Sequence, residues 1–269
     1  MNYTDINQRI EEIKATPLKN MNESEVYRFI LNCIDLTTLE GSDNEQKIND
    51  LCHTALSFAA TGKNVKNPSA VCVYPPFVAQ AKRLLAGSDT RVASVAGAFP
   101  SGQSPIEIKV AEVSYAVNEG ADEIDMVISR GKFLEGKYEE VGSEIRAIKK
   151  ACKNAKLKVI LETGELQTPE NIYKASRIAI EAGADFIKTS TGKIAVNATP
   201  EAFIVMLDAI ADYHRETGKM VGIKAAGGIS DPETALVYVK LVENVLGDAW
   251  LNNQYFRIGA SRLAKKLPL

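Results

Sequence analysis

From residue 29 onward, eight short apolar segments alternate with longer segments of helical periodicity, and this alternation constrains the fold more than any other feature. Short β-branched runs predict buried strands, and the segments between them predict helices, so the chain has the pattern of repeated βα units around a parallel sheet. The predicted strands FILNCIDL, AVCVY, RVASVAGA, EIDMVI, KVILET, DFIKTS, MVGIKA and FRIGA begin at Phe29, Ala70, Arg91, Glu123, Lys158, Asp185, Met220 and Phe256.

Eight such units predict a closed (β/α)8 barrel, that is, a TIM barrel of the α/β class. An open doubly wound sheet more often has five or six strands and a nucleotide-binding glycine loop, and no G-x-G-x-x-G follows the first predicted strand. A barrel needs roughly 250 residues, so residues 1–269 are expected to form one barrel domain. Residues 1–28 are expected to form an N-terminal helical extension, which lies either across the bottom of the barrel or beside its first strand.

The ends of several predicted helices carry recognisable signals. Proline follows a capping side chain at Thr168-Pro169, Thr199-Pro200 and Asp231-Pro232, as it does at the first position of many helices. Glycine precedes the next strand at Gly87, Gly120 and Gly183, where a left-handed residue would end the helix.

Charge and composition narrow the function classes. The net charge is -2 with a pI near 5.9, and the basic residues are scattered, so we expect a small-molecule substrate and no nucleic acid partner. The N-terminus lacks the apolar core of a signal peptide and no apolar run approaches a membrane span, so a cytoplasmic protein without a membrane partner is expected. Four separated cysteines and two histidines favour reduced thiols and argue against a zinc site.

Polar residues near the carboxyl ends of the predicted strands are the candidate functional residues, because that end of a barrel carries the active site. They are Asp35, Thr37, Thr38, Asp125, Glu162, Lys188 and Lys224. One lysine in such a strand would be interpreted as a rim residue whose ammonium reaches solvent. Two lysines on neighbouring strands, both directed inward by strand alternation, instead indicate a reactive site.

A lysine attacks a carbonyl only in its neutral form, which is about one molecule in 10³ at pH 7 for a free side chain. A second ammonium about 5 Å away disfavours the charged form by about 3 kcal/mol at an effective dielectric of 20, or roughly two pKa units. Burial would supply the rest of the shift. Because the repulsion is mutual, it does not decide whether Lys188 or Lys224 is the nucleophile.

Asp125 is the candidate acid and base, since even-numbered strands contribute to common interior layers and Asp125 can therefore lie level with Lys188. The competing interpretation is an ion pair that only satisfies a buried lysine. Glu162, at the exit of the fifth strand, remains a second candidate for proton transfer.

Three glycine-bearing loops predict an anion site beside the lysines. Backbone N–H groups approach phosphate closely where glycine is present, and phosphate sites in barrels commonly use the loops after strands seven and eight. The loops are Thr191-Gly192-Lys193, Gly227-Gly228 and Gly259-Ala260-Ser261-Arg262, the last at the expected start of the final helix.

Taken together, these segments closely resemble the deoxyribose-phosphate aldolase family from the first strand to the last helix. The matching motifs are DLTTL at Asp35, ADEIDMVI at Ala121, KVILETGEL at Lys158, ADFIKTSTGK at Ala184, NATPE at Asn197 and GIKAAGGI at Gly222. The resemblance implies that Lys188 forms the Schiff base, that Lys224 lowers the pKa of Lys188 and assists proton transfer, and that Asp125 is the acid and base.

The resemblance also implies the substrate contacts. Asp35, Thr37 and Thr191 match residues around the substrate hydroxyls, and Gly192, Lys193, Gly227, Gly228 and Ser261 match the phosphate pocket. Two departures from the family pattern are Ala225, where many relatives have proline, and Arg262, where close relatives have a second serine.

The resulting hypothesis is reversible cleavage of 2-deoxy-D-ribose 5-phosphate without metal or organic cofactor, and a homodimer is one assembly that the family allows. A Schiff-base aldolase of the transaldolase or fructose-bisphosphate type, and a non-catalytic sugar-phosphate sensor, remain the alternatives.

Overall fold

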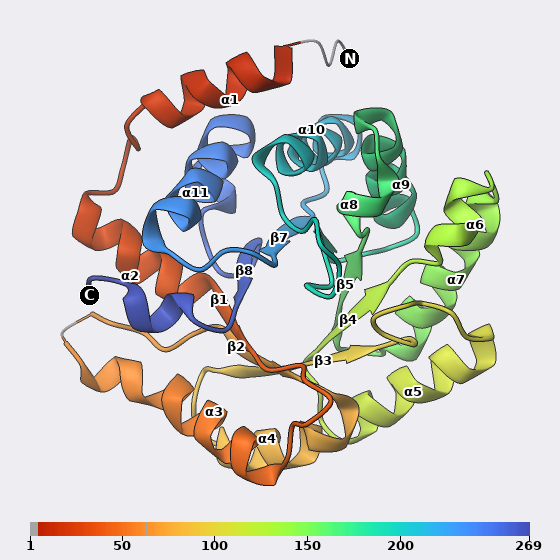
Figure 1. Ribbon diagram of the computed structural model, residues 1–269, viewed down its shortest axis with the longest axis horizontal. Coiled ribbons are helices and arrows are strands. Elements are labelled where there is room, and N and C mark those ends of the chain that lie inside the picture. The colour runs from red at the N-terminus through yellow and green to blue at the C-terminus, as the bar shows by residue number, and fades with distance from the viewer. Residues whose placement is uncertain (1–4, 63) are drawn as a thin grey trace.

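The computed structural model describes residues 5–62 and 64–269. Its parallel strands close into a barrel of eight, in which each strand pairs with the next along the chain and β8 pairs with β1 (Figure 1). This is the (β/α)8 barrel that the alternating segments predicted. The strands are β1 (Ile34–Thr37), β2 (Ala70–Val73), β3 (Arg91–Ala96), β4 (Glu123–Val127), β5 (Lys156–Ile160), β6 (Phe186–Lys188), β7 (Gly222–Ala226) and β8 (Phe256–Ala260).

Helices surround the strands as an outer layer. The α-helices are α1 (Ile6–Ala15), α2 (Glu23–Cys33), α3 (Glu45–Ser57), α4 (Val78–Leu84), α5 (Ile106–Asn118), α6 (Arg130–Leu134), α7 (Tyr138–Ala151), α8 (Thr163–Leu166), α9 (Pro169–Glu181), α10 (Pro200–Thr217) and α11 (Pro232–Leu246). Short 3-10 helices are η2 (Phe58–Ala60), η3 (Pro75–Phe77), η4 (Asp248–Trp250) and η5 (Leu263–Lys266). In the part of the chain described here, no helix is long and apolar enough to cross a bilayer.

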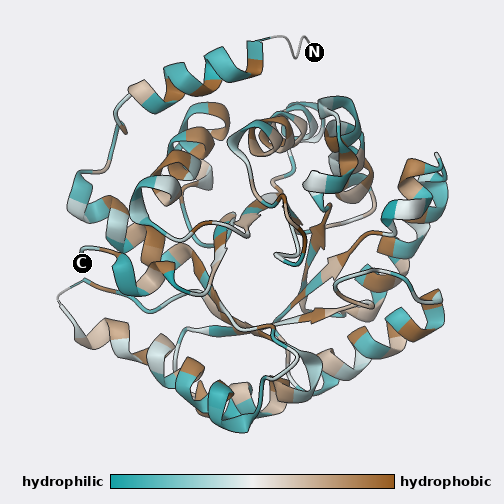
Figure 2. Cartoon of the chain, in the orientation of Figure 1, coloured by the Kyte–Doolittle hydropathy of each residue, from teal (hydrophilic) through white to brown (hydrophobic). Residues whose placement is uncertain are grey.

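The main hydrophobic core lies between the strands and this outer layer. The strands are mostly hydrophobic, whereas the helices carry both hydrophilic and hydrophobic residues (Figure 2). Ile187 and Ile223 are fully buried members of that core, as expected for the strand face that points to the helices. A smaller apolar cluster, formed by Leu39, Ala70, Cys72, Ala93 and Val95, is separate from it. Much of the rest of the barrel interior is occupied by buried charged side chains.

The predicted helix signals are confirmed at both ends. The side chains of Thr168, Thr199 and Asp231 each accept a hydrogen bond from a backbone N–H in the first turn, and proline occupies the start of each helix. Gly87, Gly120 and Gly183 have φ values of 81°, 103° and 99°, in the left-handed region that favours glycine.

The first predicted strand is wrong over residues 29–33, which complete helix α2. That helix begins at a capping box, in which the Asn22 side chain accepts from the Glu25 N–H and the Glu25 carboxylate accepts from the Asn22 N–H. Its buried positions, Val26, Tyr27, Ile30 and Leu31, have helical spacing. A continuous apolar run does not distinguish a buried helix from a strand. Here the capping box at Asn22 favours the helix.

The N-terminal segment lies against the outer helices and not across the bottom of the barrel. Helix α1 lies outside α10 and α11 (Figure 1), where Arg9 pairs with Asp208 at 2.8 Å and Lys240 Nζ donates to the Lys14 carbonyl oxygen at 2.6 Å. Residues 1–4 of the predicted extension are outside the described residues.

Candidate active site

Inward-facing side chains stack in layers along the barrel axis, because alternate strands contribute four residues to each layer. The register of the strands gives an upper layer near their carboxyl ends, then a middle layer and a lower layer. The upper layer is Cys72, Asp125, Lys188 and Gly259; the middle layer is Asp35, Ala93, Lys158 and Lys224; the lower layer is Ala70, Glu123, Phe186 and Arg257. Charged groups dominate all three layers on the side away from β2 and β3.

Asp125 is the carboxylate on which the buried amines converge. Its Oδ2 accepts hydrogen bonds from Lys188 Nζ and Lys224 Nζ, each at 2.8 Å, and its Oδ1 accepts from Lys158 Nζ at 2.8 Å. Lys188 is 3% exposed, and the other three side chains are fully buried. The structure therefore brings together the three predicted catalytic residues, and adds a third lysine to them.

The three lysines differ in how many carboxylates they contact. Lys158 Nζ lies 2.5 Å from Glu123, 2.8 Å from Asp125 and 3.4 Å from Asp35. Lys224 Nζ lies 2.5 Å from Asp35 and 2.8 Å from Asp125. Among the described residues, Lys188 pairs with Asp125 alone.

These contacts give the lysines opposite electrostatic properties. Burial lowers the pKa of Lys188, Asp125 opposes this effect, and the charge of Lys224 lowers the pKa again, so the net change is downward. Burial also acts on Lys224, but Asp125 and Asp35 outweigh it and raise its pKa. The pKa of Lys158 is likewise raised against burial, by three carboxylates. Lys188 is therefore the amine of this group that loses its proton most readily.

These contacts distinguish two lysines that the repulsion argument treated alike. Lys188 and Lys224 are paired in the register of β6 and β7, as expected, so their repulsion is mutual. Burial contributes more than that repulsion to the lowered pKa of Lys188. The difference between the two lysines comes from Asp35, which contacts Lys224 and not Lys188.

The other members of the charged network hold their ionised forms. Burial opposes ionisation of Asp125, yet Lys158, Lys188 and Lys224 keep its pKa well below the usual range. Burial likewise raises the pKa of Asp35, and nearby cations, of which Lys158 has the largest effect, lower it below its usual value. Both carboxylates thus remain negatively charged near neutral pH, and Asp125 is set to accept hydrogen bonds.

The structure places the residues expected near the substrate hydroxyls at different depths. Asp35 is fully buried and bonded to Lys224 and, at 2.5 Å, to Arg257, so it lies beneath Lys188. Thr37 lies above it on β1, where its Oγ1 donates to the Asp35 carbonyl oxygen at 2.8 Å. Thr191 follows β6 and donates from its backbone N–H to Glu162 at 3.1 Å.

Glu162, the second candidate for proton transfer, belongs to a different network. Its carboxylate pairs with Arg130 at 3.1 Å and accepts from both the N–H and the Oγ1 of Thr191. None of its contacts in the described residues is with a lysine of the barrel interior. Asp125 is therefore the carboxylate adjacent to Lys188.

Above Lys188, the buried hydroxyl of Ser190 finds no hydrogen-bond partner among the described residues. Strand alternation places it on the same side of the chain as Lys188. A buried hydroxyl without a partner is costly, so this atom is a candidate to hydrogen-bond a polar group that enters the barrel beside Lys188.

The three predicted phosphate loops lie side by side, because β6, β7 and β8 are neighbours in the barrel. Gly192, Gly227 and Gly228 have φ values of 81°, 85° and 81°, which favour glycine, and Gly192 and Gly228 are exposed. Lys193 is exposed and pairs with Glu40 at 3.0 Å. Ser261 and Arg262 are exposed after β8.

Two details of the third loop differ from expectation. The chain after Arg262 forms the 3-10 helix η5 of four residues, so no long final helix begins there. A Cβ at Gly259 would lie 3.1 Å from Lys224 Cε and 3.0 Å from Ala226 Cβ. Gly259 therefore makes room for the Lys224 side chain, which the sequence did not reveal.

Lys158 and Arg257 are the charged interior residues that the sequence interpretation missed. Arg257 is fully buried and pairs with Glu123 at 2.7 Å as well as with Asp35. The alternation rule that singled out Lys188 and Lys224 also directs Lys158 inward on β5 and Arg257 inward on β8. Applied to every strand, that rule would have found both.

Comparison with known proteins identifies the class. A family model described as DeoC/LacD family aldolase matches residues 29–245. A deoxyribose-phosphate aldolase of Bos taurus and one of Homo sapiens are each 45% identical, over 98% of this chain and 86% of theirs. The structure is similar to the tetrameric deoxyribose phosphate aldolase of Aeropyrum pernix, with a TM-score of 0.71 and 25% identity over 98% of this chain and 95% of that one.

The protein is an aldolase, a carbon–carbon lyase built on a (β/α)8 barrel. More particularly, the chain belongs to the DeoC/LacD aldolase family, since the family model spans most of its length. The family resemblance inferred from the sequence motifs is confirmed.

Proposed function

We propose that this aldolase reversibly cleaves 2-deoxy-D-ribose 5-phosphate to D-glyceraldehyde 3-phosphate and acetaldehyde through a Schiff base on Lys188. The observation that carries this assignment is the unequal pairing of the lysines, because Lys188 contacts one carboxylate and has a lowered pKa. The relatives named for deoxyribose-phosphate supply the substrate class.

In this mechanism the neutral Lys188 Nζ attacks C1 of the open-chain sugar, and loss of water gives a protonated imine. Removal of the proton from the C3 hydroxyl breaks the C2–C3 bond, whose electron pair moves to C2 and neutralises the imine as an enamine. D-glyceraldehyde 3-phosphate leaves, C2 takes up a proton, and water hydrolyses the imine to release acetaldehyde and the free amine.

Asp125 and Lys224 supply the proton transfers. Asp125 Oδ2 lies 2.8 Å from both amines, within the distance that direct transfer requires. The raised pKa of Lys224 keeps it protonated, so it can donate its proton to Asp125 and take a proton back in a later step. Ser190, whose hydroxyl is free among the described residues, is available to a hydroxyl of the sugar.

The phosphate group is held by the loops after β6, β7 and β8. Its ligands are the backbone N–H groups of Gly192, Gly227, Gly228, Gly259 and Ser261, together with the side chains of Ser261, Lys193 and Arg262. Asp35, Thr37 and Thr191 complete the substrate site, Asp35 by holding Lys224 in its charged form. Arg262 adds a charge-assisted hydrogen bond where relatives have serine.

The enzyme works without metal or organic cofactor, as a single barrel domain in the cytoplasm, and a homodimer is one assembly that the family allows. Deoxyribonucleotide breakdown is the source of its substrate. These assignments follow the family.

The decisive experiment is borohydride reduction in the presence of acetaldehyde or 2-deoxyribose 5-phosphate, followed by intact mass and peptide mapping. The proposal requires an acetaldehyde-derived adduct on Lys188 and release of D-glyceraldehyde 3-phosphate. Release of a different aldehyde or ketone fragment would indicate a transaldolase or fructose-bisphosphate type of aldolase. Binding of the sugar phosphate without an adduct would indicate a sensor.

Phosphate recognition is tested separately. Replacing Arg262 by alanine should raise KM for the phosphorylated sugar by about tenfold, the scale of one charge-assisted hydrogen bond, and leave free deoxyribose unaffected. Lys265→Ala, which removes an exposed charge three residues away, is the matched control. Equal losses on both sugars would place the phosphate elsewhere.

A further inference from the structure

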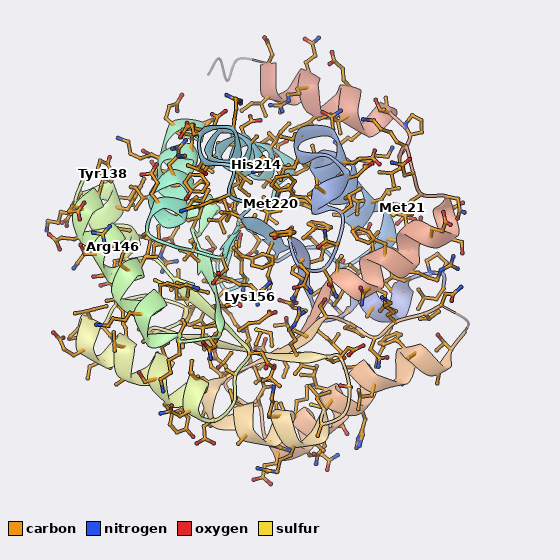
Figure 3. The ribbon with its side chains drawn as sticks, turned by 180° about the vertical axis from the view of Figure 1, so that it is seen from behind. Met21, Tyr138, Arg146, Lys156, His214 and Met220 are labelled. Carbon is orange, nitrogen blue, oxygen red and sulfur yellow. The ribbon has the colours of Figure 1, made fainter. Side chains whose placement is uncertain are left out.

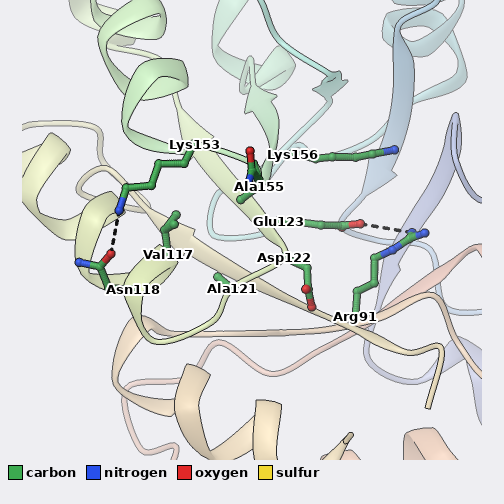
Figure 4. A pocket seen from close by; sticks show the side chains of 10 residues that line it. Arg91, Val117, Asn118, Ala121, Asp122, Glu123, Lys153, Ala155 and Lys156 are labelled. Carbon is green, nitrogen blue, oxygen red and sulfur yellow. Dashed lines mark hydrogen bonds and ion pairs between the residues drawn. The ribbon is translucent and has the colours of Figure 1, made fainter. Parts of the chain in front are cut away.

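A cavity lies at the amino ends of the barrel strands, away from the carboxyl ends that carry Lys188. It holds about 600 Å³ and is lined by the starts of β3, β4 and β5 and by the ends of α5 and α7 (Figure 4). Lys156, which opens β5, lies near the centre of the molecule in the view from behind (Figure 3). Ile160 is level with Lys188 in the register, and four residues of strand separate it from Lys156, or about 13 Å.

The carboxylates that line this cavity are already neutralised. Asp122 pairs with Lys82 at 2.6 Å through one oxygen and accepts from the Val92 N–H at 2.9 Å through the other. Glu123 lies 2.5 Å from Lys158 and 2.7 Å from Arg257. Both carboxylates therefore already have close cationic partners outside the lining of the cavity.

The cations of the cavity are held less tightly. Lys156 Nζ donates to the Gln254 side-chain oxygen at 3.2 Å and pairs with no carboxylate among the described residues. Arg91 reaches Glu123 only at 3.5 Å, and Lys153 donates to Asn118 at 3.1 Å (Figure 4). Arg91 and Lys156 enter from the strands on either side of β4. The cavity thus carries unneutralised positive charge.

Lys156 is also electrostatically strained. It is half-buried, and burial lowers the pKa of its ammonium group despite the carboxylate of Glu123. Its Nζ lies 5.7 Å from the centre of the Phe186 ring, which offers weak cation–π compensation. A bound anion would restore the stabilisation that burial removes.

We infer that this cavity is a second binding site, for a small phosphate monoester. A phosphate dianion can accept from the guanidinium of Arg91 through two oxygens and from the ammonium group of Lys156, which lie on the same side of the cavity (Figure 4). The walls formed by Val117, Ala121 and Ala155 receive the organic part of the ligand. The volume is within the range of small-molecule sites.

Glycerol 2-phosphate is the probe, because it has no carbonyl and cannot form an imine. Titration calorimetry of the unmodified protein should show two sites, one at the phosphate loops and one in this cavity. The Arg91→Gln, Lys156→Gln double variant should weaken one site by tenfold or more, and the Arg262→Gln, Lys193→Gln variant should weaken the other.

A Lys47→Gln, Lys219→Gln variant changes two exposed lysines elsewhere by the same net charge and should retain both sites. Lys156→Arg should restore most of the affinity lost in Lys156→Gln, which separates charge from folding effects. The inference is overturned if the double cavity variant binds the probe with the stoichiometry and affinity of the parent. It is also overturned if the parent has one site, and the loop variant removes it. Either result leaves the aldolase assignment intact, since borohydride trapping tests that independently.

Discussion

Two layers of the barrel interior each contain buried lysine and aspartate, yet their lysines have opposite properties. In the middle layer, Lys158 and Lys224 each contact two or more carboxylates and their pKa values are raised. In the upper layer, Lys188 contacts Asp125 alone and its pKa is lowered. Burial favours the neutral amine in all three lysines. The number of carboxylates in contact with each lysine determines whether its pKa is lowered or raised.

This difference explains how a barrel can hold several buried amines and lower the pKa of one of them. The middle layer keeps its lysines charged, and the charge on Lys224 then disfavours a charge on Lys188. A cluster in which every amine had its own pair of carboxylates would hold no nucleophile at neutral pH. The four predictions below test this comparison, beginning with the largest expected effect.

Replacing Lys188 by alanine removes the proposed nucleophile from the upper layer. Turnover should fall by on the order of 10⁴ or more, and no borohydride-trapped adduct should form. The exposed Lys47→Ala variant is the control and should behave as the parent. Circular dichroism should show an unchanged fold. An adduct that maps to Lys224 or Lys158 would show that carboxylate contacts do not select the reactive amine.

Replacing Asp125 by asparagine removes the one carboxylate that the two layers share. Turnover should fall by about 10² or more, the scale of a positioned acid or base, and breaking the buried ion pairs should cost about 3–5 kcal/mol of stability. Because Asp125 raises the pKa of Lys188, imine formation should extend to lower pH. The measurement is the pH dependence of borohydride trapping, compared with the turnover rate of the same variant. Full turnover would assign proton transfer to Glu162 or to water, with Glu162→Gln as the comparison.

Replacing Lys224 by leucine removes the middle-layer charge that acts on Lys188. The pKa of Lys188 should rise, because the repulsion is lost and Asp125 has one amine fewer to share. Imine formation at neutral pH should fall about tenfold to a hundredfold and recover partly at alkaline pH. Recovery stays incomplete if Lys224 also transfers a proton. A trapping profile identical to that of the parent would refute the coupling.

Replacing Lys158 by methionine tests the amine with the most carboxylate contacts. Its loss leaves Glu123 and Asp125 less well compensated, so stability should fall by about 3–5 kcal/mol, seen as a lower melting temperature. Lys158 is not among the main influences on the pKa of Lys188, so the trapping profile should shift less than in Asp125→Asn or Lys224→Leu. A shift as large as that of Lys224→Leu would show that the two layers act as one unit.

The barrel and most of its boundaries could be predicted, because alternating short and long apolar segments are local patterns. The largest departure, residues 29–33, arose where an apolar run suited a strand and a helix equally and the capping box at Asn22 was overlooked. The predicted strand KVILET also begins two residues after the start of β5 and runs into helix α8, which begins at Thr163. Motifs similarly identified the family, and the inward direction of Lys188, Lys224 and Asp125 followed from strand alternation.

The sequence by itself determined which side chains point into the barrel, because alternation along a strand has a period of two residues. It could not determine which of those side chains meet. Asp35 is 189 residues from Lys224, and only closure of β8 onto β1 brings Asp35 beneath the lysines. The tertiary structure therefore decided which amine is left with a single carboxylate, because ion-pair energies depend on distances across the barrel that no local pattern encodes.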